Sequence, residues 1–183
     1  MPIGIIIAII AAVLLLGLAA LGWIGLEKRS LRRSFGVEYE TVAQEHDTRQ
    51  EVDRELLRRR RRHDTLRLQA ISVNDQEYYA TSWEHLQGEF LDDPALALNA
   101  AGQLVSQLLD ARGYPGDDPR ERLALLSVKH AATLGDYRRA RQISEHVRTK
   151  SLATPTEEIR QALLTYHTLF NELMAVPGAL AAR

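Results

Sequence analysis

Five consecutive arginines form the densest group of charged side chains in this 183-residue chain. They are Arg58, Arg59, Arg60, Arg61 and Arg62. On a helix with about 3.6 residues per turn the five side chains surround the axis, so they cannot form a single docking stripe. A solvated helix is the favoured interpretation. The alternatives are attraction to anionic lipid headgroups, worth about 1 kcal/mol per basic residue near the surface, and RNA binding, which is disfavoured because no aromatic stacking residue interrupts the run.

Histidines are the second group of side chains able to do chemistry, as metal ligands or acid–base catalysts. The chain has six: His46, His63, His85, His130, His146 and His167. The sequence contains no His-Glu-x-x-His motif, and no two of the six stand three to five residues apart, as zinc sites usually require. We therefore expect no metal site, and expect each histidine to lie at the surface or at the edge of the core.

The remaining candidates for catalysis are also weak. The acidic pairs at 92–93 and 117–118 each precede a proline, which is typical of helix caps. The chain has no cysteine, which excludes cysteine nucleophiles, disulfides and thiolate metal sites. It also has no Gly-rich phosphate loop, nucleophile elbow or Walker pattern. We therefore predict that the protein is not an enzyme and uses no cofactor, with an unrecognised enzyme as the remote alternative.

The amino-terminal segment predicts a membrane anchor. Residues 1–26 carry no charged side chain, and residues 3–24 are almost entirely Ile, Leu, Val, Ala and Gly. At about 1.5 Å per residue the apolar run spans about 33 Å, enough to cross a hydrocarbon core of about 30 Å as a helix. Trp23 is expected to anchor its end at the interface. A cleaved secretory signal is the less favoured alternative, because such signals open with basic residues and have a shorter apolar core.

The flanking charges predict the orientation of this anchor. Lys28, Arg29, Arg32 and Arg33 follow the span, whereas no basic side chain precedes it. Basic residues near a span favour the cytoplasmic side, so we predict an external amino terminus and a cytoplasmic carboxy-terminal domain in the cell membrane. These four residues are also candidate lipid contacts. The arginines at 58–62 reach the same lipids only if the chain folds back near Gly36 or His46, because electrostatic attraction fades within about 8–10 Å.

Charge is unevenly divided along the rest of the chain. Residues 27–67 hold 12 Lys and Arg against 9 Asp and Glu, a net charge of +3. Residues 68–183 hold 11 against 15, a net charge of −4. A mildly acidic distal domain disfavours nucleic acid as a partner.

Everything after the anchor has helical periodicity. Asp47 is expected to cap a charged helix at 47–64, unless this helix continues from 34–46. Ser72 opens the next helix with Asp75 in the capping-box position, and two more caps are expected at 93–94 and 118–119. A further capping box at 154–157 starts the last helix. The expected core stripes are Tyr79, Trp83, Leu86 and Phe90; Ala97, Ala101, Leu104, Val105, Leu108 and Leu109; Leu134, Tyr137, Ala140, Ile143 and Val147; and Ile159, Leu163, Tyr166, Phe170 and Leu173.

The loop at 113–119 contains Gly113, Tyr114 and Pro115. We expect a Tyr-Pro turn that plugs the end of the bundle, with a recognition loop as the less favoured alternative.

These observations predict an all-α protein with no strand. The expected organisation is a transmembrane anchor at 1–26, a charged helical stalk and connector at 27–71, a bundle of four to five helices at 72–176, and a flexible tail at 177–183.

Several segments carry a resemblance to a known family. They are RSFGVEYETVAQEHDTRQEVDREL at 33–56, the aromatic helix that ends in LDDP, RGYP at 112–115, LSVKH at 126–130, YRRARQI at 137–143 and IRQALLTYHTLFNEL at 159–173. Together they resemble an uncharacterised actinobacterial family of small, single-pass membrane proteins with a helical domain. The resemblance implies this architecture and no activity, substrate or cofactor. Members are sometimes described as secreted, which is the alternative to the cytoplasmic orientation.

We therefore predict a membrane-tethered helical module that binds an unidentified protein partner. The alternative is a peripheral domain that senses anionic lipid through the arginines at 58–62.

Overall fold

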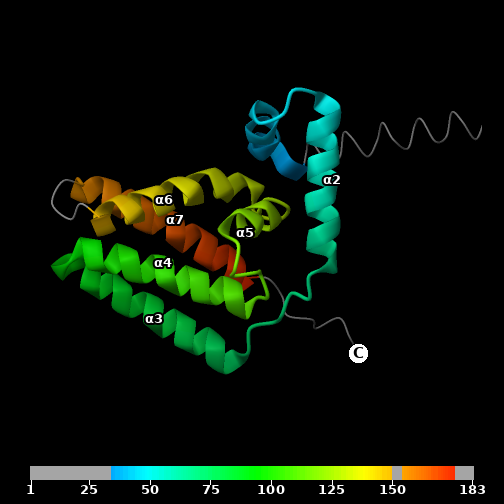
Figure 1. Ribbon diagram of the computed structural model, residues 1–183. Helices are drawn as coiled ribbons and strands as arrows, with labels where there is room; N and C mark the ends of the chain where they lie inside the picture. The colour runs from blue at the N-terminus through cyan, green and yellow to red at the C-terminus, as the bar shows by residue number, and fades with distance from the viewer. Residues whose placement is uncertain (1–33, 150–153, 176–183) are drawn as a thin grey trace, which may run out of the picture. The chain divides into compact units, whose positions relative to one another are not determined.

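The computed structural model describes residues 34–149 and 154–175, which contain helices and no strand (Figure 1). The all-α prediction is therefore confirmed for these residues. The predicted anchor with Trp23, the basic residues that follow it and the tail at 177–183 lie outside them. None of the described helices combines the length and apolar character that crossing a membrane requires.

The chain divides into two compact units between Leu57 and Arg58, inside helix α2 (Arg49–Thr65). In the first unit, a helical segment at 34–44 is followed by a break at 45–48, after which α2 begins. Five apolar side chains of this unit are buried, at helical spacings of three or four within each helix: Phe35, Tyr39, Val42, Val52 and Leu56.

The cap of α2 differs from the predicted one. The side chain of Thr48 accepts a hydrogen bond from the backbone N–H of Glu51 (3.3 Å), and the Glu51 carboxylate accepts one from the N–H of Thr48 (3.2 Å). This reciprocal pair is a capping box, so Asp47 is not the cap. The segments 34–44 and α2 are therefore separate helices, because the chain leaves helical geometry before Thr48 restarts it.

The second unit contains a five-helix bundle, in agreement with the predicted four to five helices. Its helices are α3 (Val73–Asp92), α4 (Pro94–Ala111), α5 (Pro119–Leu126), α6 (Ala131–Thr149) and α7 (Thr156–Ala175). Helix α4 is central, because it packs against α3, α6 and α7 (Figure 1). Helix α6 also packs against α7 and against the short α5.

The predicted stripes form the core of this bundle. All six predicted α4 residues and all five predicted α7 residues are buried, while Phe90 and Ile143 are only partly buried. Trp83 stacks on Phe170 and on His167, with ring centroids 4.9 Å apart in both pairs. Burial of a large apolar side chain contributes about 1.5–3 kcal/mol, so the aromatic stripe of α3 fixes that helix against α7.

Three of the four predicted caps of the bundle are confirmed. Ser72, Asp93 and Asp118 each accept hydrogen bonds from backbone N–H groups in the first turn of the following helix. The capping box predicted at Thr154 is wrong. Helix α7 begins at Thr156, one residue later than that cap would start it, and the N–H groups of Glu158 and Ile159 bond to the carbonyl of Pro155. The Thr154 hydroxyl has no hydrogen-bond partner within the described residues.

The RGYP segment joins three parts of the bundle. Tyr114 is buried, which confirms the Tyr-Pro plug, and burial raises the pKa of its phenol to about 12. The Arg112 side chain is 3% exposed and donates to the carbonyls of Leu173 at the end of α7 and of Gln69 in the connector. Gly113 has a φ of +91°, in the left-handed region.

Candidate functional site

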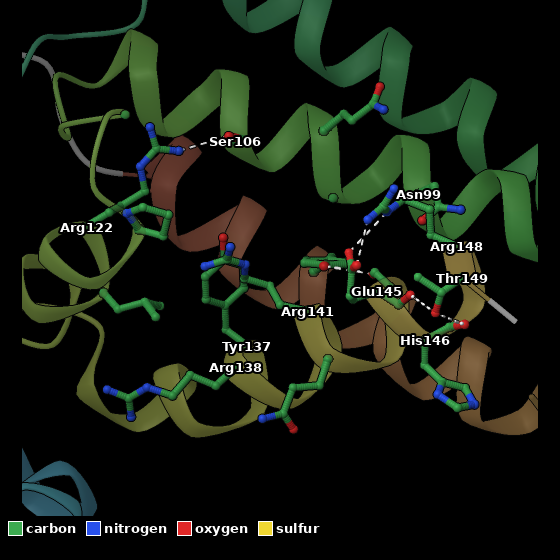
Figure 2. Close-up of a pocket in the computed structure, with 18 residues that line it drawn as sticks. Asn99, Ser106, Arg122, Tyr137, Arg138, Arg141, Glu145, His146, Arg148 and Thr149 are labelled. Carbon is green, nitrogen blue, oxygen red and sulfur yellow. Dashed lines mark hydrogen bonds and ion pairs between the residues drawn. The ribbon is translucent and has the colours of Figure 1, made fainter.

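An open groove of about 1230 Å³ runs between α4 and α6 (Figure 2). One wall comes from α4 and carries Asn99, Gln103 and Ser106. The other wall is the face of α6 between Tyr137 and Thr149, and α5 closes one end with Arg122. All of these residues belong to the second unit.

The floor of the groove is built from two tyrosines and a serine. The hydroxyl groups of Tyr166 and Ser144 are 2.9 Å apart, and the rings of Tyr137 and Tyr166 meet edge to face with centroids 5.8 Å apart. Gly102 allows this arrangement, because a Cβ at that position would lie 3.2 Å from the Tyr166 hydroxyl. The absence of a side chain on α4 therefore lets α7 place a phenol in the groove.

Both phenols are neutral at physiological pH. Burial, opposed by the Ser144 hydrogen bond and by Arg141, raises the pKa of Tyr166 to about 12. Burial likewise raises the pKa of Tyr137, with Arg141 and Arg122 acting in the opposite direction. Neutral hydroxyls donate hydrogen bonds to an anion or a carbonyl, so the floor offers donors rather than a base.

Arginines dominate the charge of the groove. Arg122, Arg138, Arg141 and Arg148 line it, and Glu145 is the single carboxylate among the described residues of the lining. Arg148 forms a two-pronged pair with Glu145 (2.6 and 3.1 Å), which lowers the pKa of that carboxyl. In Figure 2, Arg141, Glu145 and Arg148 extend into the space between α4 and α6, whereas Arg138 and His146 point away from α4.

Arg122 closes the end of the groove and has a structural role. Its guanidinium donates to the carbonyl of Pro115 (2.7 Å) and to the Ser106 hydroxyl (2.9 Å), and it pairs with Asp110. The side chain is buried. These contacts tie α5 and the 113–118 loop to α4, so the charge of Arg122 is already compensated.

The arginines predicted as lipid contacts at 58–62 lie on the last part of α2, and none of them is among the residues that line the groove. Arg58, Arg60, Arg61 and Arg62 are exposed and Arg59 is partly buried. Arg62 pairs with Glu121 of α5, and Arg58 and Arg59 have interactions of their own. Lipid contact by this run stays a prediction, as it does for Lys28, Arg29, Arg32 and Arg33 outside the described residues.

Two histidines correct the expectation that all six lie at the surface or edge. His130 is 7% exposed, and its Nδ1 lies 2.6 Å from the Glu172 carboxylate, which also accepts from the Thr133 hydroxyl. His63 is 5% exposed and packs near the ring of Tyr114, and neither ring nitrogen has a hydrogen-bond partner among the described residues. His63 follows the arginine run at 58–62, and His130 follows Lys129, so the immediate neighbours give no signal of burial. No group of metal-ligating residues is found within the ranges that the structure describes.

The buried state of His63 predicts a loss of stability at acidic pH. Burial, reinforced by Lys129 and His130, lowers the pKa of His63 below 6.5, although the Asp64 carboxylate, 3.8 Å away, opposes the shift. The unfolded chain therefore binds a proton below about pH 6.5 before the folded chain does. We expect stability to fall as pH falls through this window, and His63→Phe to weaken that dependence.

Denaturant unfolding between pH 7 and pH 5 measures this dependence. His85→Gln is the matched control, because His85 is exposed and its replacement should leave the pH dependence of the wild type unchanged. If the free energy of unfolding depended on pH in the same way in the wild type and in His63→Phe, His63 would not be the source of the acid destabilisation.

The groove was not among the sites predicted from the sequence. One signal was present: Tyr137, Arg141, Ser144 and Arg148 recur at spacings of four, three and four, which places them on one face of α6. The sequence does not show that this polar face of α6 lines a groove, because the opposite wall comes from α4 and part of the floor from α7.

Comparison with protein-family models, with curated proteins and with solved structures found no match to this chain. The resemblance to the actinobacterial membrane family therefore stays a prediction.

Proposed function

We propose that this protein is a membrane-tethered interaction module that binds a partner protein through the groove between α4 and α6. The observation that carries the proposal is the groove itself. Its volume of about 1230 Å³ exceeds the usual range of about 300–1,000 Å³ for small-molecule sites, and it is open to solvent. Grooves between helices commonly receive a peptide segment of a partner.

The lining supports binding rather than catalysis. Its two phenols are neutral, its single carboxylate is paired with Arg148, and its buried arginine is committed to Asp110. A nucleophile or general base needs a partner that activates it, and none of these groups is arranged in that way. The groove instead offers hydroxyl, amide and guanidinium donors along two helices.

The tether and its orientation are part of the same proposal. The apolar segment at 1–26 anchors the chain, and the basic residues after it place the groove on the cytoplasmic side. The chain has no native cysteine, so Gln87→Cys, at an exposed position of α3, gives a single thiol. We expect this thiol to resist a membrane-impermeant reagent in intact cells and to react after lysis. Labelling of this thiol in intact cells would contradict the cytoplasmic orientation and place the groove outside the cell.

Site-specific photocrosslinking tests the groove as the binding site. The full chain carries a photoreactive phenylalanine analogue at Gln103, which is exposed and lines the groove. Gln87 is the matched control, since it is an exposed glutamine on α3 outside the groove. We expect one adduct from Gln103, absent from Gln87, which mass spectrometry maps to one segment of one protein. Equal adducts from both positions, or none from Gln103 in cells where both chains are expressed, would contradict the proposal.

A further inference from the structure

The charge of the groove is opposite to that of the region that forms it. Residues 68–183 have a net charge of −4. Among the residues of this region that the structure describes, four of nine Lys and Arg line the groove, whereas only Glu145 of the 15 acidic residues does so. The cations are therefore concentrated where a ligand would lie, and electrostatic complementarity selects a negatively charged occupant.

Two of the four arginines are already neutralised and a third is turned away. Arg122 pairs with Asp110, and Arg148 forms its two-pronged pair with Glu145. Arg138 points away from α4 (Figure 2). Arg141 is exposed, extends into the groove, and has no hydrogen bond or ion pair within the part of the chain that the structure describes.

Arg141 lines the groove together with neutral hydroxyl donors. Tyr137, Ser144 and Tyr166 are lining residues of the same groove, and the rings of the two tyrosines meet edge to face with centroids 5.8 Å apart. Tyr166 in turn is hydrogen-bonded to Ser144. A guanidinium beside neutral hydroxyls is a suitable environment for a carboxylate, which accepts two parallel bonds from arginine and has lone pairs left for the hydroxyls.

We infer, on the basis of the proposed function, that the groove receives an acidic segment of the partner protein and that Arg141 binds one of its carboxylates beside Tyr137 and Tyr166. The volume of the groove, about 1230 Å³, suits a peptide segment rather than a single small anion. Nucleic acid does not fit, because both tyrosines are buried and offer no exposed ring for a base to stack on.

Peptide binding to the full chain in uncharged detergent tests this inference. The probe is a short peptide of alternating glutamate and alanine with an uncharged fluorophore, and its control has glutamine in place of glutamate. Fluorescence anisotropy should show binding of the glutamate peptide alone. Arg141→Gln should weaken that binding about tenfold, since a hydrogen bond to a charged group contributes enough for such a change.

Arg139→Gln is the matched control, because Arg139 is an exposed arginine of α6 that does not line the groove. It should leave binding within about twofold of the wild type, since exposed charges outside the contact contribute little. Equal binding of both peptides, or equal losses in the two arginine variants, would overturn the inference. Displacement of the peptide by inorganic phosphate but not by acetate would also overturn it, in favour of a phosphate ligand. Each of these results leaves the Gln103 crosslink unaffected, so the inference and the proposed function fail separately.

Discussion

Arg112→Met is expected to lower the free energy of unfolding by about 2–4 kcal/mol, because it removes the donors to the buried carbonyl of Leu173 and to the carbonyl of Gln69. The guanidinium donates from Nε to the Leu173 carbonyl (2.9 Å) and from Nη1 to the Gln69 carbonyl (2.8 Å), and Nη2 also reaches Leu173. The side chain is 3% exposed, so water does not replace these bonds. Methionine has a similar length and fills the space, which isolates the loss of the donors.

The position of Arg112 explains why the loss is large. Leu173 lies in the last turn of α7, where the carbonyls have no partner within the helix and where positive charge is favourable. Gln69 lies in the connector between α2 and α3, and its backbone N–H bonds to the Arg112 carbonyl. One side chain therefore holds the connector, the end of α4 and the end of α7 together.

Chemical denaturation monitored by circular dichroism measures this effect. Arg120→Met is the control, since Arg120 is exposed in the first turn of α5 and its replacement should change stability by less than about 0.5 kcal/mol. The loss of stability in Arg112→Lys should lie between those of the other two variants, because a lysine ammonium lacks the planar set of donors with which the guanidinium reaches two carbonyls. A loss below about 1 kcal/mol in Arg112→Met would show that the carbonyls find other partners.

The helices of the bundle were predictable because their signals are local. Ser72, Asp93 and Asp118 each precede a helical stripe, and a cap acts on backbone groups only two or three residues away. The stripes repeat with the period of the helix, so the buried face of α4 follows from its sequence. Thr154 fails because the Glu157 carboxylate accepts hydrogen bonds from Arg160 and Gln161, one turn further along α7, instead of closing a capping box.

The groove and the buried histidines were not predictable because they depend on partners distant in sequence. His130 is buried through Glu172, which lies 42 residues away. The groove needs Gly102 of α4 to face Tyr166 of α7, and helical periodicity does not say which helices become neighbours. The arginine run at 58–62 is recognisable in the sequence because it is contiguous, whereas the arginines of the groove are separated along the chain and form no recognisable motif.

Gly113→Ala is expected to lower the free energy of unfolding by about 1–3 kcal/mol, the cost of a non-glycine residue in a strained backbone conformation. Gly113 has a φ of +91°, and it ends α4 in a Schellman motif: its N–H bonds to the Asp110 carbonyl and the Tyr114 N–H to the Leu109 carbonyl. A Cβ would also lie 2.9 Å from the Arg67 carbonyl oxygen. That oxygen cannot easily move, because Arg112 fixes the connector two residues further on. Its carbonyl accepts from the Gln69 N–H, and its guanidinium donates to the Gln69 carbonyl.

Gly88→Ala is the matched control and should have the opposite sign. Gly88 lies inside α3, and a Cβ there would meet no heavy atom within 4 Å. Alanine is the better helix former, so this change should stabilise the protein by up to about 1 kcal/mol. Thermal and denaturant unfolding of the two variants should therefore move in opposite directions from the wild type. If both variants were stabilised, the left-handed turn after α4 would not be required by the fold. The hydrogen bonds between Arg112 and the connector would then have to tolerate a shift of the Arg67 carbonyl.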